Sequence, residues 1–204
     1  MAKFLGNLTN VIIAGVVLLV IVLAIMAGAY GGVGLNIDKS WWATLVRWLH
    51  IGSGVMWIGI LYYFNFVQTP TMPKIPQEQR PTIIGFILPE ALFWFRWGAM
   101  STIVFGIILA WMNGYLGDAY ALGITSHQPK HTMIGIGMWL ATIMWFNVWF
   151  IIWPNQKIVM GMVQKTADEK AKAGRVAGQT SRINTLLSIP MLFCMASTHT
   201  IALI

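Results

Sequence analysis

Charged residues are scarce in this sequence: they make up 9% of its 204 residues, whereas hydrophobic residues make up 57%. A soluble domain carries about 25% charged residues, so this composition excludes an ordinary water-soluble protein. Acidic residues are the scarcer kind, 6 against 13 Lys and Arg, and the net charge is +7. The basic residues lie between apolar runs, which indicates membrane topology and contact with anionic lipid rather than binding of nucleic acid.

Cysteine is also nearly absent. The single Cys194 lies within an apolar run, so the chain has no internal disulfide. It has neither a C-x-x-C-H motif for covalent haem nor paired cysteines for zinc. We interpret Cys194 as a small packing residue.

Long apolar runs take the place of the missing charge. A helix needs roughly 20 apolar residues to cross the hydrocarbon layer, and five stretches meet this requirement. The sequence therefore predicts an all-α integral membrane protein, a single domain over 1–204, with spans at about 10–30, 43–67, 97–114, 131–153 and 183–204.

Two apolar runs need separate interpretation. The run from Val11 to Ala27 is longer than the roughly 7–15 residues of a signal-peptide core, so we expect an uncleaved span. The segment 82–95 is short and contains Pro89. We expect it to lie at the interface or to re-enter the membrane before the third span.

The loops predict the orientation of the spans. Basic residues concentrate in 68–96 and 154–182, and Lys3 precedes the first span. The positive-inside rule places these regions in the cytoplasm, so five crossings put the C-terminus outside. We expect the chain in the cell inner (cytoplasmic) membrane, with the inner end of the bundle marked by Trp94, Trp97 and Trp153.

Three histidines fall near the outer ends of different spans. His50 lies in the second span, His131 opens the fourth and His199 ends the fifth. At a rise of about 1.5 Å per residue, these imidazoles come to one leaflet. An ionisable residue inside a membrane is costly and indicates a functional site. His127 is separated from His131 by Pro129, which argues against one continuous helical face.

Imidazoles from different helices are suitable ligands for the iron of b-type haem. Copper or another metal ion is a less favoured alternative. Gly54 and Gly135 each follow a histidine by one turn. They leave room either for a flat macrocycle or for close helix packing. Arg47 precedes His50 by one turn and is placed to pair with a haem propionate, or to extend toward the surface. Asn65 and Asn147 are polar residues within apolar runs, and Asn147, Thr142 and Ser188 are expected to tie helices together.

Four ordered blocks of sequence resemble the membrane domain of the bacterial membrane-bound urate hydroxylases, also called the urate oxidase N-terminal domain. They are RWLHIGSGVMWIGILYYF (47–64), PEALFWFRW (89–97), GIGMWLATIMWFNVWFIIWPNQ (135–156) and SRINTLLSIPMLFCMASTH (181–199). The resemblance implies a helical membrane protein tied to oxidative purine breakdown and the respiratory chain. The family's histidines match His50, His131 and His199.

The chain departs from the family pattern in several places. Relatives typically carry a c-type cytochrome domain after the last helix, whereas this sequence stops at Ile204. It is shorter in the middle, and Ile183 stands where relatives often have histidine. We therefore expect a separate c-type cytochrome, or other subunits of a membrane complex, as partner.

Three functions remain open from the sequence. The first is a membrane redox subunit that binds haem b near the outer face and exchanges electrons with a c-type cytochrome. The second is an enzyme that oxidises urate or a related purine. The third is a non-catalytic helical subunit of a respiratory or photosynthetic complex.

Overall fold

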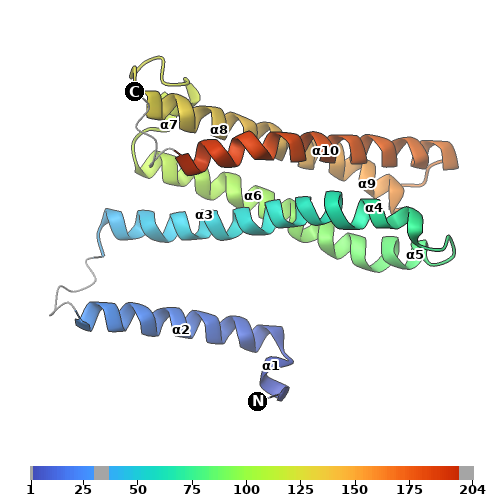
Figure 1. Cartoon of the computed structure of the whole chain (residues 1–204), viewed down its shortest axis with the longest axis horizontal. Coiled ribbons are helices and arrows are strands. Elements are labelled where there is room, and N and C mark those ends of the chain that lie inside the picture. Colours follow the sequence, from blue (N-terminus) through green and yellow to red (C-terminus); the bar gives the residue numbers. More distant parts are fainter. Residues whose placement is uncertain (1, 30–36, 198–204) are drawn as a thin grey trace. The chain divides into compact units, whose positions relative to one another are not determined.

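The structure is a computed structural model that describes residues 2–29 and 37–197. Every regular element in these ranges is a helix and none is a strand, which confirms the all-α prediction there. The chain divides into two compact units, Met1–Trp42 and Ala43–Ile204 (Figure 1). The predicted ligand His199 lies outside the described residues.

The first unit contains α1 (Ala2–Leu5) and α2 (Leu8–Ala29). The side-chain oxygen of Asn7 accepts hydrogen bonds from the backbone N–H groups of Thr9 (2.9 Å) and Asn10 (3.4 Å), and it thereby caps the start of α2. No charged residue interrupts α2. A helix that is apolar on all sides suits a lipid environment.

The second unit is a bundle of long helical segments that run in alternating directions (Figure 1). The short helix α7 (Leu116–Tyr120) lies at one end of this bundle, and α4, α5 and α9 lie at the other. The segments are α3 (Lys39–Tyr62), η1 (Tyr63–Gln68), α4 (Thr69–Thr71) and η2 (Met72–Lys74); α5 (Arg80–Thr82), η3 (Ile83–Ile87) and α6 (Leu88–Met112); α8 (Pro129–Phe146), η4 (Asn147–Ile152) and α9 (Trp153–Val159); and α10 (Ala167–Ser197).

Within the described residues, four helices are long and apolar enough to cross a membrane. They are Leu8–Ala27, Lys39–Lys74, Arg80–Met112 and Pro129–Val159. Each overlaps one of the first four predicted spans, but the third helix begins at Arg80, well before the predicted start at 97. The fifth predicted span, 183–204, coincides with the second half of α10 and continues past Ser197, where the description ends.

The prediction that segment 82–95 is an element separate from the third span is wrong. This segment is the first half of one continuous helix, Arg80–Met112. Pro89 does not break the helix, because the π-helix η3 precedes it. The backbone N–H of Leu88 bonds to the carbonyl of Ile83, five residues back. This wide turn accommodates a proline that has no N–H of its own.

The same device recurs in two other segments. The π-helix η1 ends two residues before Pro70, and η4 ends two residues before Pro154. In each, the residue before the proline donates its N–H to a carbonyl five residues back: Thr69 to Phe64, and Trp153 to Val148. Proline therefore widens these helices instead of ending them, and the span lengths exceed what the proline positions suggest.

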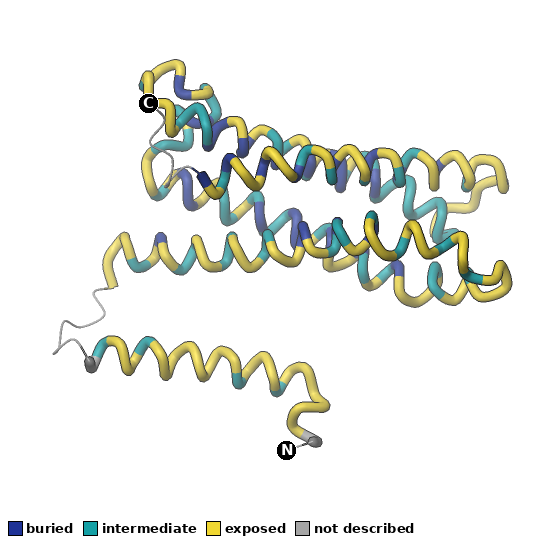
Figure 2. The backbone as a smooth tube through the Cα atoms, viewed as in Figure 1, coloured by how far each residue is buried: buried dark blue, intermediate teal, exposed yellow. Residues whose placement is uncertain are grey.

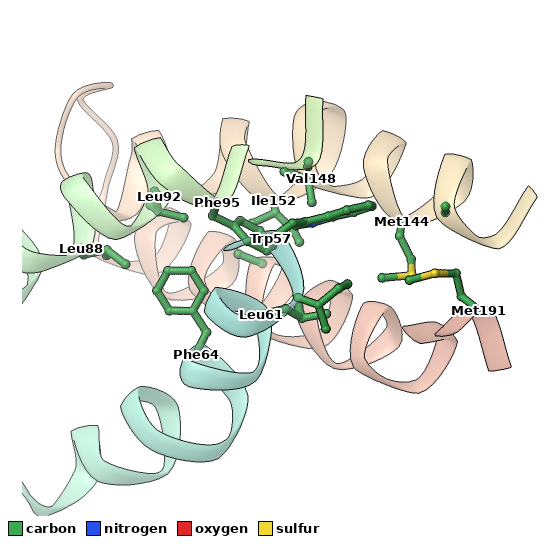
Figure 3. Packing of buried hydrophobic residues seen from close by; sticks show 14 residues of the cluster. Trp57, Leu61, Phe64, Leu88, Leu92, Phe95, Met144, Val148, Ile152 and Met191 are labelled. Atoms are coloured by element: carbon green, nitrogen blue, oxygen red, sulfur yellow. The ribbon is translucent and has the colours of Figure 1, made fainter. Parts of the chain in front are cut away.

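The hydrophobic core lies between the helices of the second unit. Trp57 and Leu61 of α3 are fully buried, as are Leu92 and Phe95 of α6 and Met144 of α8. Figure 3 shows these side chains meeting around Trp57. Exposed residues follow the outward sides of the helices (Figure 2), and many are large and apolar, as expected for a bundle whose solvent is lipid.

Polar side chains tie these helices together, as predicted. Asn147 Nδ2 donates to Asn184 Oδ1 (2.8 Å), and Asn184 Nδ2 donates to the carbonyl of Met144 (3.0 Å). The other two predicted residues also form ties, Ser188 with Tyr62 (2.9 Å) and Thr142 with Tyr120 (3.2 Å). A further tie, not predicted, joins Asn65 to Ser181 (2.8 Å). These hydrogen bonds fix which helices are neighbours.

Candidate functional site

The imidazole of His50 lies against α6, and its Nδ1 is engaged in a hydrogen bond to that helix. Its Nδ1 is 2.9 Å from the backbone carbonyl oxygen of Thr102. A carbonyl oxygen only accepts hydrogen bonds, so Nδ1 carries the proton and Nε2 keeps its lone pair. This is the arrangement of an imidazole that is oriented through one nitrogen to ligate through the other.

Small residues on α6 create the space for the His50 ring. Gly98, Thr102 and Gly106 follow one another at four-residue intervals, so they lie on one helical face. A Cβ at Gly106 would lie 2.9 Å from His50 Cε1, and a Cβ at Gly98 would lie 3.3 Å from the backbone nitrogen of Trp57. Glycine at both positions allows α3 and α6 to pack closely.

Gly54 lies on the same helix contact. A Cβ at Gly54 would have Thr102 Cγ2 as its nearest neighbour, at 3.9 Å. This is an ordinary packing distance, so Gly54 leaves the contact with α6 relaxed rather than forced. Close packing against α6 therefore does not require glycine at position 54.

His131 occupies the first turn of α8 and is also held through Nδ1. Ser126 Oγ lies 2.8 Å from this nitrogen and Asp118 Oδ2 lies 3.5 Å from it. The carboxylate favours the tautomer with the proton on Nδ1, which again leaves Nε2 as the free lone pair. The ring of Tyr115 stacks on the imidazole with centroids 6.0 Å apart.

Gly135, one turn after His131, has its space filled by protein. A Cβ at this position would overlap the carbonyl oxygen of Ala119 in α7. The absence of a side chain therefore lets α7 lie directly on α8, which carries Asp118 toward His131. Gly135 serves helix packing in this structure.

Arg47 lies at the same end of the bundle as His131, because its charge acts on Tyr115 and the Tyr115 ring stacks on His131. Burial raises the pKa of the Tyr115 hydroxyl, and the positive charge of Arg47 acts against that rise. The side chain of Arg47 is exposed. This cation and an aromatic ring thus lie on the same side of the bundle as His131, at the end that carries α7.

His127, the other histidine among the described residues, is placed differently. His127 precedes α8, is exposed and has a backbone φ of 51°, so it is not on the face of His131. It lines a separate surface hollow of about 470 Å³ with Leu122 and Thr132. Within residues 2–29 and 37–197, no three His, Cys, Asp or Glu side chains converge as ligands for a metal ion.

Several residues of the site were not singled out from the sequence. Thr102 contributes only a backbone carbonyl, which no side-chain pattern reveals. The four-residue spacing of Gly98, Thr102 and Gly106 is a readable signal of a closely packed helix face. Asp118, an acidic residue in a loop with few charges, is the other signal that sequence reasoning had available.

Comparison with known proteins gives one family match. The family model described as urate oxidase N-terminal matches residues 119–204, which covers less than half of the chain and includes His131 and α10. The resemblance expected from the sequence is confirmed over these residues. Neither the curated proteins nor the solved structures contain a significant match.

Proposed function

We propose, on the premise that residues 119–204 carry the pattern of the urate oxidase N-terminal family, that this chain is a membrane redox subunit. It holds b-type haem near the outer face and exchanges electrons with a separate c-type cytochrome. The N-terminus is cytoplasmic and five helices cross the inner membrane, because the basic loops then lie inside. The ligands are drawn from His50, His131 and His199.

The observation that carries this proposal is the state of the two described imidazoles. Each is fixed through Nδ1, His50 by the Thr102 carbonyl at 2.9 Å and His131 by Ser126 at 2.8 Å. The Thr102 carbonyl only accepts, so His50 presents Nε2 as a lone pair. Ser126 can donate or accept, and for His131 it is the Asp118 carboxylate at 3.5 Å from Nδ1 that favours the same tautomer. Histidines that ligate a metal ion commonly hold their other ring nitrogen in such a hydrogen bond, so this pattern supports ligation.

Haem would supply the one-electron chemistry, and the chain's residues would set its conditions. Thr102 and Asp118 orient the imidazoles and hold the proton on Nδ1. The exposed Arg47 is placed to neutralise a propionate at the outer surface. The apolar core around Trp57 excludes water from the bundle.

A difference spectrum of the purified full chain tests this proposal. We expect b-type absorption bands in the dithionite-reduced minus oxidised spectrum of protein from haem-replete cells, and at least a tenfold loss of haem in His50→Ala and His131→Ala. His127→Asn is the matched control, since it removes an exposed histidine at a backbone φ that asparagine tolerates. Wild-type protein without such bands would overturn the proposal.

A second function is favoured by the neighbours of His131. The Arg47 cation, the Tyr115 ring and the imidazole lie at the same end of the bundle, which suits an anionic planar heterocycle such as urate. Urate consumption by cells that express the chain, lost in His131→Ala and retained in His127→Asn, would favour this enzyme reading. If neither haem nor urate depends on the histidines, the non-catalytic subunit is the remaining function.

A further inference from the structure

A second polar group lies away from the histidines, on α6 and the segment η4–α9. The guanidinium carbon of Arg96 lies 3.4 Å from the ring centre of Trp153 and 5.5 Å from that of Trp149. Lys157 Nζ lies 5.8 Å from the same Trp153 ring. Because Trp149, Trp153 and Lys157 are spaced four residues apart, they lie on one helical face. Arg96 and Lys157 thus converge on one indole.

The charges of this cluster are not balanced by protein. The ion pairs among the described residues are His131–Asp118 and Lys165–Glu169, so neither Arg96 nor Lys157 has a carboxylate partner there. Arg96 Nε donates to the carbonyl of Leu92 at 3.2 Å. Stacking on indole stabilises a cation, but two like charges on one ring repel each other. An anion between them would remove that repulsion.

We infer that Arg96, Trp153 and Lys157 bind the phosphate group of an anionic phospholipid. Arg96 and Lys157 are half-buried, so both side chains remain accessible to a ligand. Trp94 and Trp97, on either side of Arg96, are 51% and 47% exposed, and exposed indoles favour the headgroup level of a bilayer. The planar guanidinium offers two parallel N–H donors to phosphate oxygens. Basic pockets between membrane helices suit such headgroups.

Native mass spectrometry of the detergent-solubilised full chain tests this site. The probe is phosphatidylglycerol, with phosphatidylcholine as the neutral lipid. Each cation near a lipid surface contributes about fivefold to anionic-lipid binding. We therefore expect Arg96→Gln/Lys157→Gln to weaken phosphatidylglycerol binding about 25-fold and to leave phosphatidylcholine binding unchanged.

The matched control is Lys172→Gln/Arg175→Gln, which removes one lysine and one arginine from exposed positions on α10. It should retain phosphatidylglycerol binding. An equal loss in this control would show diffuse attraction rather than a site and would overturn the inference. Competition by inorganic phosphate at equal concentration would also overturn it, since the ligand would then be a soluble anion. If the double variant does not fold, Lys157→Gln alone should lose about fivefold.

Discussion

The contact between α3 and α6 and the contact between α8 and α10 solve the problem of polar groups in a lipid-embedded bundle in opposite ways. Between α8 with its continuation η4 and the facing helix α10, Asn147 of η4 and Asn184 bond to each other at 2.8 Å, and Asn184 also bonds to the Met144 carbonyl of α8. Between α3 and α6, His50 bonds through one nitrogen to a backbone carbonyl. The two asparagines therefore satisfy each other's hydrogen-bonding groups, whereas His50 uses only Nδ1 and leaves the lone pair of Nε2 for another partner.

Under the proposed function, the difference separates polar groups that hold the bundle together from a polar group that holds a cofactor. A buried amide pair stabilises the bundle because leaving either partner alone is costly. An imidazole bonded on one side is of little use as a tie, because aliphatic residues pack helices without the desolvation cost. Its retention makes sense where Nε2 has a ligand. The two contacts therefore predict different outcomes when each is disturbed.

The largest effect is expected from Gly106→Ala. The added Cβ would lie 2.9 Å from His50 Cε1 and 3.1 Å from Nδ1, so the ring must move away from the Thr102 carbonyl. We expect a tenfold or greater loss of bound haem, the usual cost of disturbing a ligand's supporting group. The haem-to-protein ratio of the purified variant measures it.

Gly54→Ala is the matched control for this variant. Its Cβ would approach no atom closer than Thr102 Cγ2 at 3.9 Å, so the haem content should remain at the wild-type level. A loss of haem in both variants would mean that any added side chain between α3 and α6 expels the cofactor. The proposal that haem binding depends on the orientation of the His50 ring would then be wrong.

A smaller effect, on stability alone, is expected from Asn184→Leu. The change leaves Asn147 Nδ2 buried without its acceptor, and we expect the bundle to lose about 1–2 kcal/mol of unfolding free energy. Thermal unfolding in detergent, with haem content as the second readout, measures it. Haem content should not change in the folded fraction.

The double variant Asn147→Leu/Asn184→Leu sharpens this test. Replacing both partners of a hydrogen bond by apolar groups is close to neutral, so the double variant should recover most of the lost stability. If the double variant is less stable than Asn184→Leu, the two amides do more than satisfy each other's hydrogen bonds. The contrast between a purely structural pair and His50 would then be wrong.

Much of the fold follows from periodicity and composition, because lipid enforces helices wherever apolar runs are long enough. The segment 82–95 was mispredicted because Pro89 was taken as a helix breaker. A π-turn that absorbs proline depends on backbone spacing five residues back, and no residue type signals it. The same ambiguity applies to Pro70 and Pro154.

The histidines of the candidate site could be found from the sequence, but their partners could not. Burial cost singles out an imidazole in an apolar run. The partner of His50 is a backbone carbonyl, and that of His131 depends on how α7 lies on α8 through Gly135. Both require the packed structure, since the interactions join residues through helix contacts rather than through spacing along one helix.

The smallest effect is expected at the start of α10, where Thr166 and Glu169 cap the helix. Glu169 Oε2 accepts a hydrogen bond from the backbone N–H of Thr166 at 2.9 Å, and Thr166 Oγ1 accepts one from the N–H of Glu169 at 3.3 Å. This reciprocal pair is a capping box. It lowers the pKa of Glu169 from its ordinary 4.5 to about 2, chiefly through the bond from Thr166.

A lowered carboxyl pKa stabilises the folded form above the unfolded pKa and loses that effect as the pH falls through the folded value. The contribution of Glu169 should therefore be complete above about pH 4.5 and disappear toward pH 2. Amide hydrogen exchange of residues 167–172 measures the fraying of this helix end. Glu169→Ala should fray it at neutral pH as acid does in the wild type, and the Asn147–Asn184 contact should not respond. Fraying that spreads to Asn184 would show that the cap and the buried amides act as one unit.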